Sequence, residues 1–132
     1  MTANRFNFRV WDKNNKCFST GLLLTRKGIL KEVDFEEGTI TTVNQTNYEL
    51  MQSTGLVDKN GKEIYEEDIL KFISEGRIIT FRIYFDKKRD CLCARALNDA
   101  IDCQIDKQFC SNKIVIGNTY ENPELLEEIR RK

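Results

Sequence analysis

Hydrophobic and polar residues alternate with a period of two through much of the chain. Phe6, Phe8 and Val10 alternate with polar neighbours, and residues 78–85 and 101–105 repeat the pattern. Successive side chains of a β-strand point to opposite faces, so this alternation predicts strands with one face on a core. Short turns separate them, at 12–15, 36–38, 58–61, 75–76, 86–90 and 98–99. We therefore predict a mainly β fold, α+β at most.

Only the C-terminal segment has a helical pattern. Asn122 is the expected N-cap, Pro123 fits the first helical position, and the acidic residues precede the basic ones. That order complements the helix dipole. Leu125, Leu126 and Ile129 form one apolar stripe. Because so short a helix is marginal alone, we expect it to pack on the β core through this stripe.

Charge is balanced in this chain of 132 residues, with 21 basic against 21 acidic side chains. The length suits one domain, or two small lobes that share a core. Balanced charge supplies no single-sign field to attract nucleic acid or acidic lipid. The apolar runs are too short to span a bilayer, and the N-terminus has no apolar signal core. We expect a cytoplasmic protein without membrane association.

The chain has no histidine and five cysteines. Without histidine, Ser-His-Asp and Cys-His sites are excluded, together with the usual general base near neutral pH. The odd cysteine count and the lack of paired Cys-x-x-Cys motifs favour free thiols, with no metal and no disulfide framework. Cys91 and Cys93 would project from one face of a strand, an arrangement that suits a metal or simple packing. Their role stays open.

The densest acidic cluster comprises Glu63, Glu66, Glu67 and Asp68. Carboxylates at this spacing are able to hold Mg²⁺ or share a proton. No nucleophile motif and no phosphate-binding glycine loop accompanies them. We therefore favour turn capping and solvated charge, and we predict no catalytic residue and no cofactor.

Residues 8–17 resemble residues 81–91, since each segment predicts a strand, a turn led by Asp-Lys, and a returning strand. Asp12 and Asp86 are placed to cap these turns through their side chains. The similarity ends at the turn. Shared hairpin chemistry is therefore a better interpretation than internal duplication.

Aromatic and cationic residues occupy the outer faces of two predicted strands, namely Arg9, Trp11, Arg82 and Tyr84. Such residues form a second small core, anchor a protein partner or stack bases. We rank these three roles in that order. Stacking of bases comes last because the aspartates of the neighbouring turns would repel phosphate. With three residues of the acidic segment they make up the candidate binding surface: Arg9, Trp11, Tyr65, Glu66, Asp68, Arg82 and Tyr84.

Three stretches together resemble the YopX-like proteins of bacteriophages and prophages. They are FRVWDK at 8–13, MQSTGLVDKNGKEIYEEDI at 51–69 and IVIGNTYENPELL at 114–126. The resemblance implies a viral or prophage origin, hence a bacterial host cytosol, and an SH3-like small β-barrel preceded by further β hairpins. We place a β lobe at 1–50 and the barrel with its C-terminal helix at 51–132, packed as one unit. The chain departs from the family at Glu67, where glycine is usual, and at Ser53, where an aromatic residue is common.

The resemblance implies no chemistry, so function is argued from the residues. Our first hypothesis is a non-catalytic module that engages a host or phage protein, with self-association as an open alternative. The second is a nucleic-acid-associated accessory protein that uses Lys87, Lys88, Arg89 and the basic tail at 130–132. An enzyme that relies on carboxylates ranks third.

Overall fold

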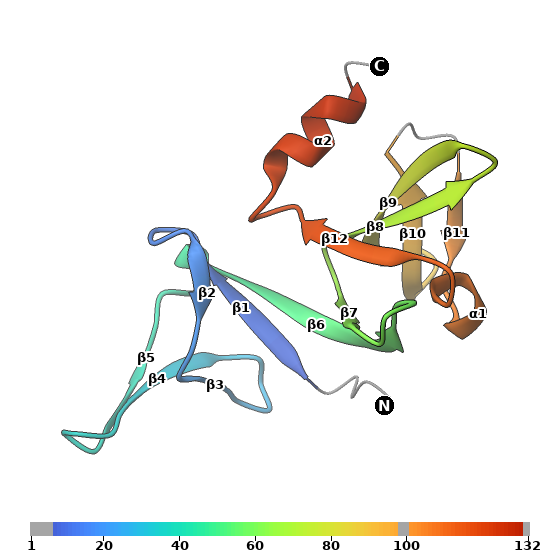
Figure 1. Ribbon diagram of the computed structural model, residues 1–132. Helices are drawn as coiled ribbons and strands as arrows, with labels where there is room; N and C mark the ends of the chain where they lie inside the picture. The colour runs from blue at the N-terminus through green and yellow to red at the C-terminus, as the bar shows by residue number, and fades with distance from the viewer. Residues whose placement is uncertain (1–6, 98–100, 131–132) are drawn as a thin grey trace. The chain divides into compact units, whose positions relative to one another are not determined.

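The computed structural model describes residues 7–97 and 101–130, and the side chains up to residue 126 (Figure 1). The predicted mainly β fold is confirmed, since strands dominate these residues and the helices among them are short. None of the described helices is long and apolar enough to cross a membrane. The chain divides into two compact units, residues 9–51 and residues 1–8 with 52–132. Each unit is described by itself.

The unit of residues 9–51 contains the three-stranded antiparallel sheet of order β3-β4-β5. It also contains the antiparallel strands β1 and β2, which belong to a four-stranded sheet of order β2-β1-β6-β7. A single 3₁₀ turn, η1, leads into the long strand β6, which enters the other unit after Met51. The elements are β1 (Phe8–Asp12), β2 (Cys17–Ser19), β3 (Leu22–Leu24), β4 (Leu30–Asp34), β5 (Thr39–Thr42), η1 (Gln45–Asn47) and β6 (Tyr48–Val57).

A small core forms in this unit around Trp11. Its ring meets the Phe18 ring edge-on, with centroids 5.1 Å apart, and the Arg9 guanidinium lies over Phe18 at 4.9 Å. Val10 is buried as well, so β1 contributes side chains to the interior from both of its faces. Such a strand is enclosed more fully than the simple alternation of β1 predicts.

The unit that begins at Gln52 holds a five-stranded antiparallel sheet of order β11-β10-β9-β8-β12. Strand β7 pairs with β6. Two short helices, α1 and α2, flank β12 in the chain. The elements are β7 (Glu63–Tyr65), β8 (Asp68–Ser74), β9 (Arg77–Asp86), β10 (Cys91–Ala96), β11 (Asp102–Gln104), α1 (Lys107–Cys110), β12 (Ile114–Asn118) and α2 (Pro123–Arg130).

The core of this unit lies on one face of β9 and β10. Phe81 and Ile83 are buried, as the alternation predicts, and they share a cluster with Leu70 and Ala94. Phe109 of α1 meets Phe81 edge-on, with ring centroids 5.2 Å apart. The opposite face of β9 carries Arg82 and Tyr84 together with the exposed Ile78, and the candidate site forms beside the two polar side chains.

Three hairpin turns have the same construction. In the turns led by Asp12, Asp34 and Asp86, one carboxylate oxygen accepts the N–H groups two and three residues later, at 2.9–3.4 Å. The residue four positions after the aspartate has a positive φ, which is 53° at Lys16, 68° at Gly38 and 54° at Asp90. The turn led by Asp34 has this construction although it lies outside the two similar segments. Shared turn chemistry therefore accounts for the sequence similarity without duplication.

Asp58 joins the turn after β6 to the edge strand β12. Its buried carboxylate accepts the backbone N–H groups of Asn60, Lys62 and Val115 at 2.8, 2.9 and 2.9 Å. Gly61 takes a positive φ (81°) in this turn. One side chain thus closes a local turn and fixes a strand more than fifty residues away.

Helix α2 begins at its proline, as predicted. Asn122 precedes it, and its carbonyl accepts the N–H of Leu125 at 3.0 Å, while its side-chain oxygen accepts the N–H of Asn118 at 3.2 Å. Leu125 and Leu126 are half-buried. The side chain of Ile129 lies outside the described residues, so packing of α2 through the whole stripe stays a prediction.

Candidate binding surface beside strand β9

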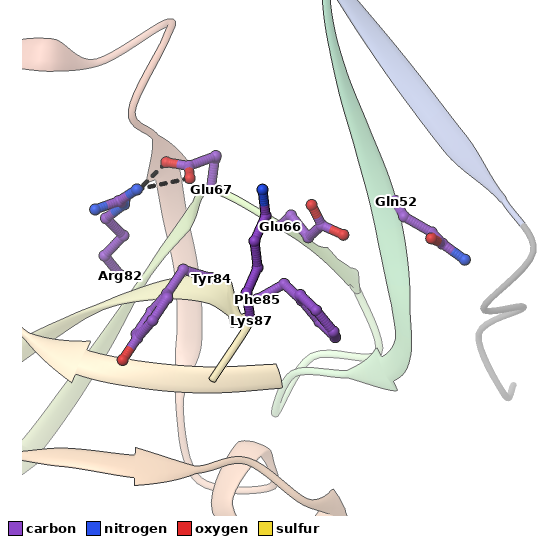
Figure 2. A pocket seen from close by; sticks show the side chains of 7 residues that line it. All are labelled: Gln52, Glu66, Glu67, Arg82, Tyr84, Phe85 and Lys87. Atoms are coloured by element: carbon purple, nitrogen blue, oxygen red, sulfur yellow. Dashed lines mark hydrogen bonds and ion pairs between the residues drawn. The ribbon is translucent and has the colours of Figure 1, made fainter. Parts of the chain in front are cut away.

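The structure separates the predicted surface into several environments. Arg82, Tyr84 and Glu66 line one depression in the unit that begins at Gln52, as Figure 2 shows. Arg9 and Trp11 belong to the unit of residues 9–51. The predicted surface is therefore described in parts.

The prediction that Trp11 lies on an exposed outer face is wrong. Only 7% of the residue is exposed, because its ring packs against Phe18 within the small core. Arg9 is half-buried, and its guanidinium stacks on the other side chain of that core, Phe18. A stacked arginine covers apolar surface with its stem while its charge stays near water. Of the three roles considered for Trp11, the geometry fits the secondary core.

Asp68 also leaves the predicted surface, since it is only 1% exposed. Its carboxylate accepts the backbone N–H of Tyr65 at 2.8 Å and so closes the connection between β7 and β8. A buried carboxylate needs such donors because desolvation otherwise penalises its charge. Asp68 therefore caps a turn, as preferred for the acidic cluster, and Tyr65 beside it is half-buried.

Glu67, which was not assigned to the predicted surface, makes the most specific contacts beside β9. Its backbone has a φ of 70°, a conformation that favours glycine. Its two carboxylate oxygens accept hydrogen bonds from Arg82 at 2.9 and 2.8 Å, and one of them also accepts the hydroxyl of Thr119 at 2.9 Å. This bond with Glu67 raises the pKa of Arg82. The sequence signals at this position were its place in the acidic cluster and the departure from the family's glycine.

The depression beside β9 encloses about 410 Å³ and has a mixed lining (Figure 2). Phe85 is its exposed aromatic residue, at 44% exposure. Burial, and then the neighbouring charge of Glu67, raises the pKa of Glu66, although the backbone N–H of Gln52 donates to its carboxylate. The lining residues are Gln52, Glu66, Glu67, Arg82, Tyr84, Phe85 and Lys87. Two acids therefore balance two bases around an aromatic wall.

The polar face of β9, β10 and β11 carries a network centred on Asp102. Arg89 and Arg95 donate to its carboxylate at 2.8 and 2.9 Å, and the Tyr84 hydroxyl donates at 2.8 Å. Arg89 donates to Asp86 as well, at 2.6 Å. The bond from Arg89 lowers the pKa of Asp102 to about 2. Each arginine of this face, Arg82 included, is thus bonded to at least one carboxylate.

Cys91 and Cys93 share a face of β10, as predicted, with their sulfur atoms 3.6 Å apart. Cys93 is buried, and this burial raises its thiol pKa to about 11. Cys103 pairs with Ala94 and so projects from the opposite face. Within the described residues, no three or more histidine, cysteine or acidic side chains are grouped to hold a metal ion. The absence of a bound metal stays a prediction.

Comparison with known proteins agrees with the fold. A family described as YopX protein matches residues 7–127. The crystal structure of protein EF1440 from Enterococcus faecalis is 27% identical, covers 90% of this chain and 96% of its own, and gives a TM-score of 0.56. Protein yopX from Bacillus subtilis is 23% identical, with 92% and 98% covered and a TM-score of 0.62. No curated protein matches the sequence.

Proposed function

The chain belongs to the YopX protein family, and we propose that it is a non-catalytic module that binds another protein through the depression beside β9. The observation that supports a protein partner is the pairing of Arg82, Arg89 and Arg95 with carboxylates. Tight binding of nucleic acid draws on several cations that contact phosphate. Here phosphate would have to displace carboxylates that already hold those cations.

The lining of the depression suits a protein partner in a second way. Protein interfaces commonly combine an aromatic anchor with a polar rim. Phe85 supplies an exposed aromatic side chain, and Glu66 and Lys87 supply charges of both signs beside it. A partner segment with an apolar side chain and flanking charges is therefore the expected ligand.

Two chemical features support a role without catalysis. The sequence has no histidine, and the raised pKa of Cys93 keeps its thiol protonated near neutral pH. We further propose, from the family resemblance, a prophage or phage origin and action in the cytosol of a bacterial host. An SH3-like barrel for the second half of the chain belongs to the same proposal.

Site-directed photo-crosslinking tests the depression. One full-length variant carries a photoreactive residue in place of Phe85, and its matched control carries it in place of Ile78, another exposed apolar residue of β9 (63%). In a bacterial host lysate, the Phe85 variant is expected to give a saturable protein adduct that the Ile78 variant does not give. Excess unmodified protein should compete for this adduct, whereas excess Phe85→Ala protein should not.

Titration against labelled single- and double-stranded DNA and RNA near 0.15 M salt tests the rival function. We expect no saturable binding at micromolar protein. Low-micromolar or tighter affinity with a steep salt dependence would overturn the proposal and favour the nucleic-acid accessory protein. Equal crosslinking from both variants would instead remove the depression as the binding site.

A further inference from the structure

Strand β5 forms an edge of the β3-β4-β5 sheet, and all four of its residues are exposed. Proteins usually protect such an edge with charge, proline, a bulge or a covering segment. Thr39-Ile40-Thr41-Thr42 contains neither a charge nor a proline, and its register with β4 is regular over all four residues. Apart from its short length of four residues, the strand therefore lacks charge, proline and a bulge as safeguards against pairing.

The hydrogen bonds to β4 identify the groups that point outward. Val43 donates to the carbonyl of Leu30 at 3.3 Å, which places these two residues at a bonded position of the ladder, although the Leu30 N–H donates to the Gln45 side chain instead. Bonded and non-bonded pairs alternate along an antiparallel ladder. Thr39 and Thr41 therefore bond to β4, while the N–H and C=O groups of Ile40 and Thr42 point away from it.

We propose that β5 pairs antiparallel with β5 of a second copy of this chain, across a two-fold axis at Thr41. In that register Ile40 of one copy faces Thr42 of the other, and the reverse. Both are outward-pointing positions, so the two copies exchange four backbone hydrogen bonds. The two Thr41 side chains then face each other across the axis.

A second copy fits this edge because the strand is self-complementary. Ile40 and Thr42 lie symmetrically about Thr41, as an isologous contact requires. The strand carries no charge, so no like charges face each other across the axis. Leu23 and Ile40 are exposed on one face of this sheet, which also carries Lys31, whose Nζ donates to the Thr42 hydroxyl at 3.1 Å. Pairing would set Ile40 of one copy beside Thr42 of the other on this face.

The pairing is expected to be reversible. Four residues on each side bury far less surface than the roughly 1,200–2,000 Å² typical of stable interfaces. Sedimentation velocity of the full chain should therefore show a monomer–dimer equilibrium that shifts with protein concentration between about 10 µM and 0.5 mM. Such high concentrations are needed because an interface this small binds weakly.

Charge reversal at Thr41 tests the axis directly. Thr41→Lys and Thr41→Glu should each weaken the dimer by about fivefold or more, because like charges would then face each other. An equimolar mixture of the two should recover the wild-type dimer, since opposite charges would then pair. Thr42→Pro removes an outward N–H from each copy and should weaken the dimer by about tenfold. Thr39→Lys with Thr39→Glu is the matched control, because Thr39 would face Val43.

Melting temperatures near that of the wild type show that the variants are folded. A wild type that stays monomeric at the highest concentration would overturn the proposal. So would a dimer that Thr42→Pro leaves unchanged, or a Thr41 mixture that does no better than either variant alone. Open-ended polymers rather than dimers would also contradict the two-fold axis. None of these results depends on the depression beside β9.

Discussion

Glu67 holds Arg82 through two parallel hydrogen bonds, while its own backbone occupies a left-handed conformation. A non-glycine residue in that conformation costs about 1 kcal/mol relative to glycine. The bidentate carboxylate–guanidinium pair offsets part of that cost, and the hydrogen bond from Thr119 contributes further stabilisation. The position where the family usually has glycine is thus occupied by a side chain that connects three segments of the unit.

Substitutions at Glu67 separate backbone strain from side-chain contact. Glu67→Ala keeps the strained backbone and loses both contacts, so it should destabilise by about 1–2 kcal/mol. Glu67→Gly loses the same contacts but removes the strain, so it should be about 1 kcal/mol more stable than Glu67→Ala. Urea unfolding monitored by circular dichroism gives both free energies.

Glu75 supplies the control for this comparison. It has a φ of 51° in the exposed β8–β9 turn, so Glu75→Gly should stabilise the protein by about 0.5–1 kcal/mol. If Glu67→Gly stabilised the protein as much as Glu75→Gly does, the pair with Arg82 would contribute nothing to stability.

Asp58 is expected to be the most sensitive turn residue. Asp58→Ala removes the acceptor for three backbone N–H groups, one of them on β12, and should destabilise by about 2–4 kcal/mol. Asp58→Asn keeps one acceptor oxygen and should cost about half as much. Thermal and urea unfolding measure the loss. Equal effects of the two substitutions would show that charge, rather than the number of acceptors, matters here.

Much of the fold follows from local pattern. The alternation in residues 78–85 predicts the buried positions Phe81 and Ile83. The aspartates at the start of the turns predict that their carboxylates accept backbone N–H groups of the turn, as Asp86 does. The alternation does not predict whether the second face of a strand is covered by other residues. Trp11 shows this, because its burial depends on Phe18 of the returning strand.

The candidate site was less accessible to sequence reasoning. Arg89 and Asp102 meet because β10 pairs with β9 on one side and β11 on the other, and that register is a tertiary property. Arg82 and Tyr84 were found from their face of β9. Glu67 was noticed as a member of the acidic cluster and as a departure from glycine, but neither observation identified Arg82 as its partner. Phe85 alternates with the polar face of its strand and yet remains partly exposed.

Acid titration tests the Asp102 network. The folded-state pKa of Asp102, about 2, lies below its usual value near 4, so its stabilisation is complete above about pH 4. This stabilisation is lost as pH falls from about 4 toward 2. Asp102→Asn should be less stable than wild type at pH 7, and the difference should shrink over that window. Glu36→Gln, in an exposed turn, is the control and should show no such convergence.

Gly117 and Asn122 provide a test of packing beside α2. A Cβ atom added to Gly117 would overlap the Asn122 side chain, whose oxygen accepts the N–H of Asn118 and whose Cγ would lie only 2.8 Å away. Gly117→Ala should therefore destabilise by about 1–3 kcal/mol, as overpacking usually does. Asn122→Gly alone should cost about 1 kcal/mol through the lost hydrogen bond.

The double variant decides whether this overlap is the cause. Once Asn122→Gly has removed the three atoms nearest to the added Cβ, the cost of Gly117→Ala should largely disappear. The double variant should then be more stable than the sum of the single effects by at least about 1 kcal/mol, which urea unfolding resolves. Additive free energies would mean that the added methyl group acts elsewhere, on the backbone of β12 itself. A coupling of the expected sign would show instead that Gly117 is required because the Asn122 side chain folds back over the strand.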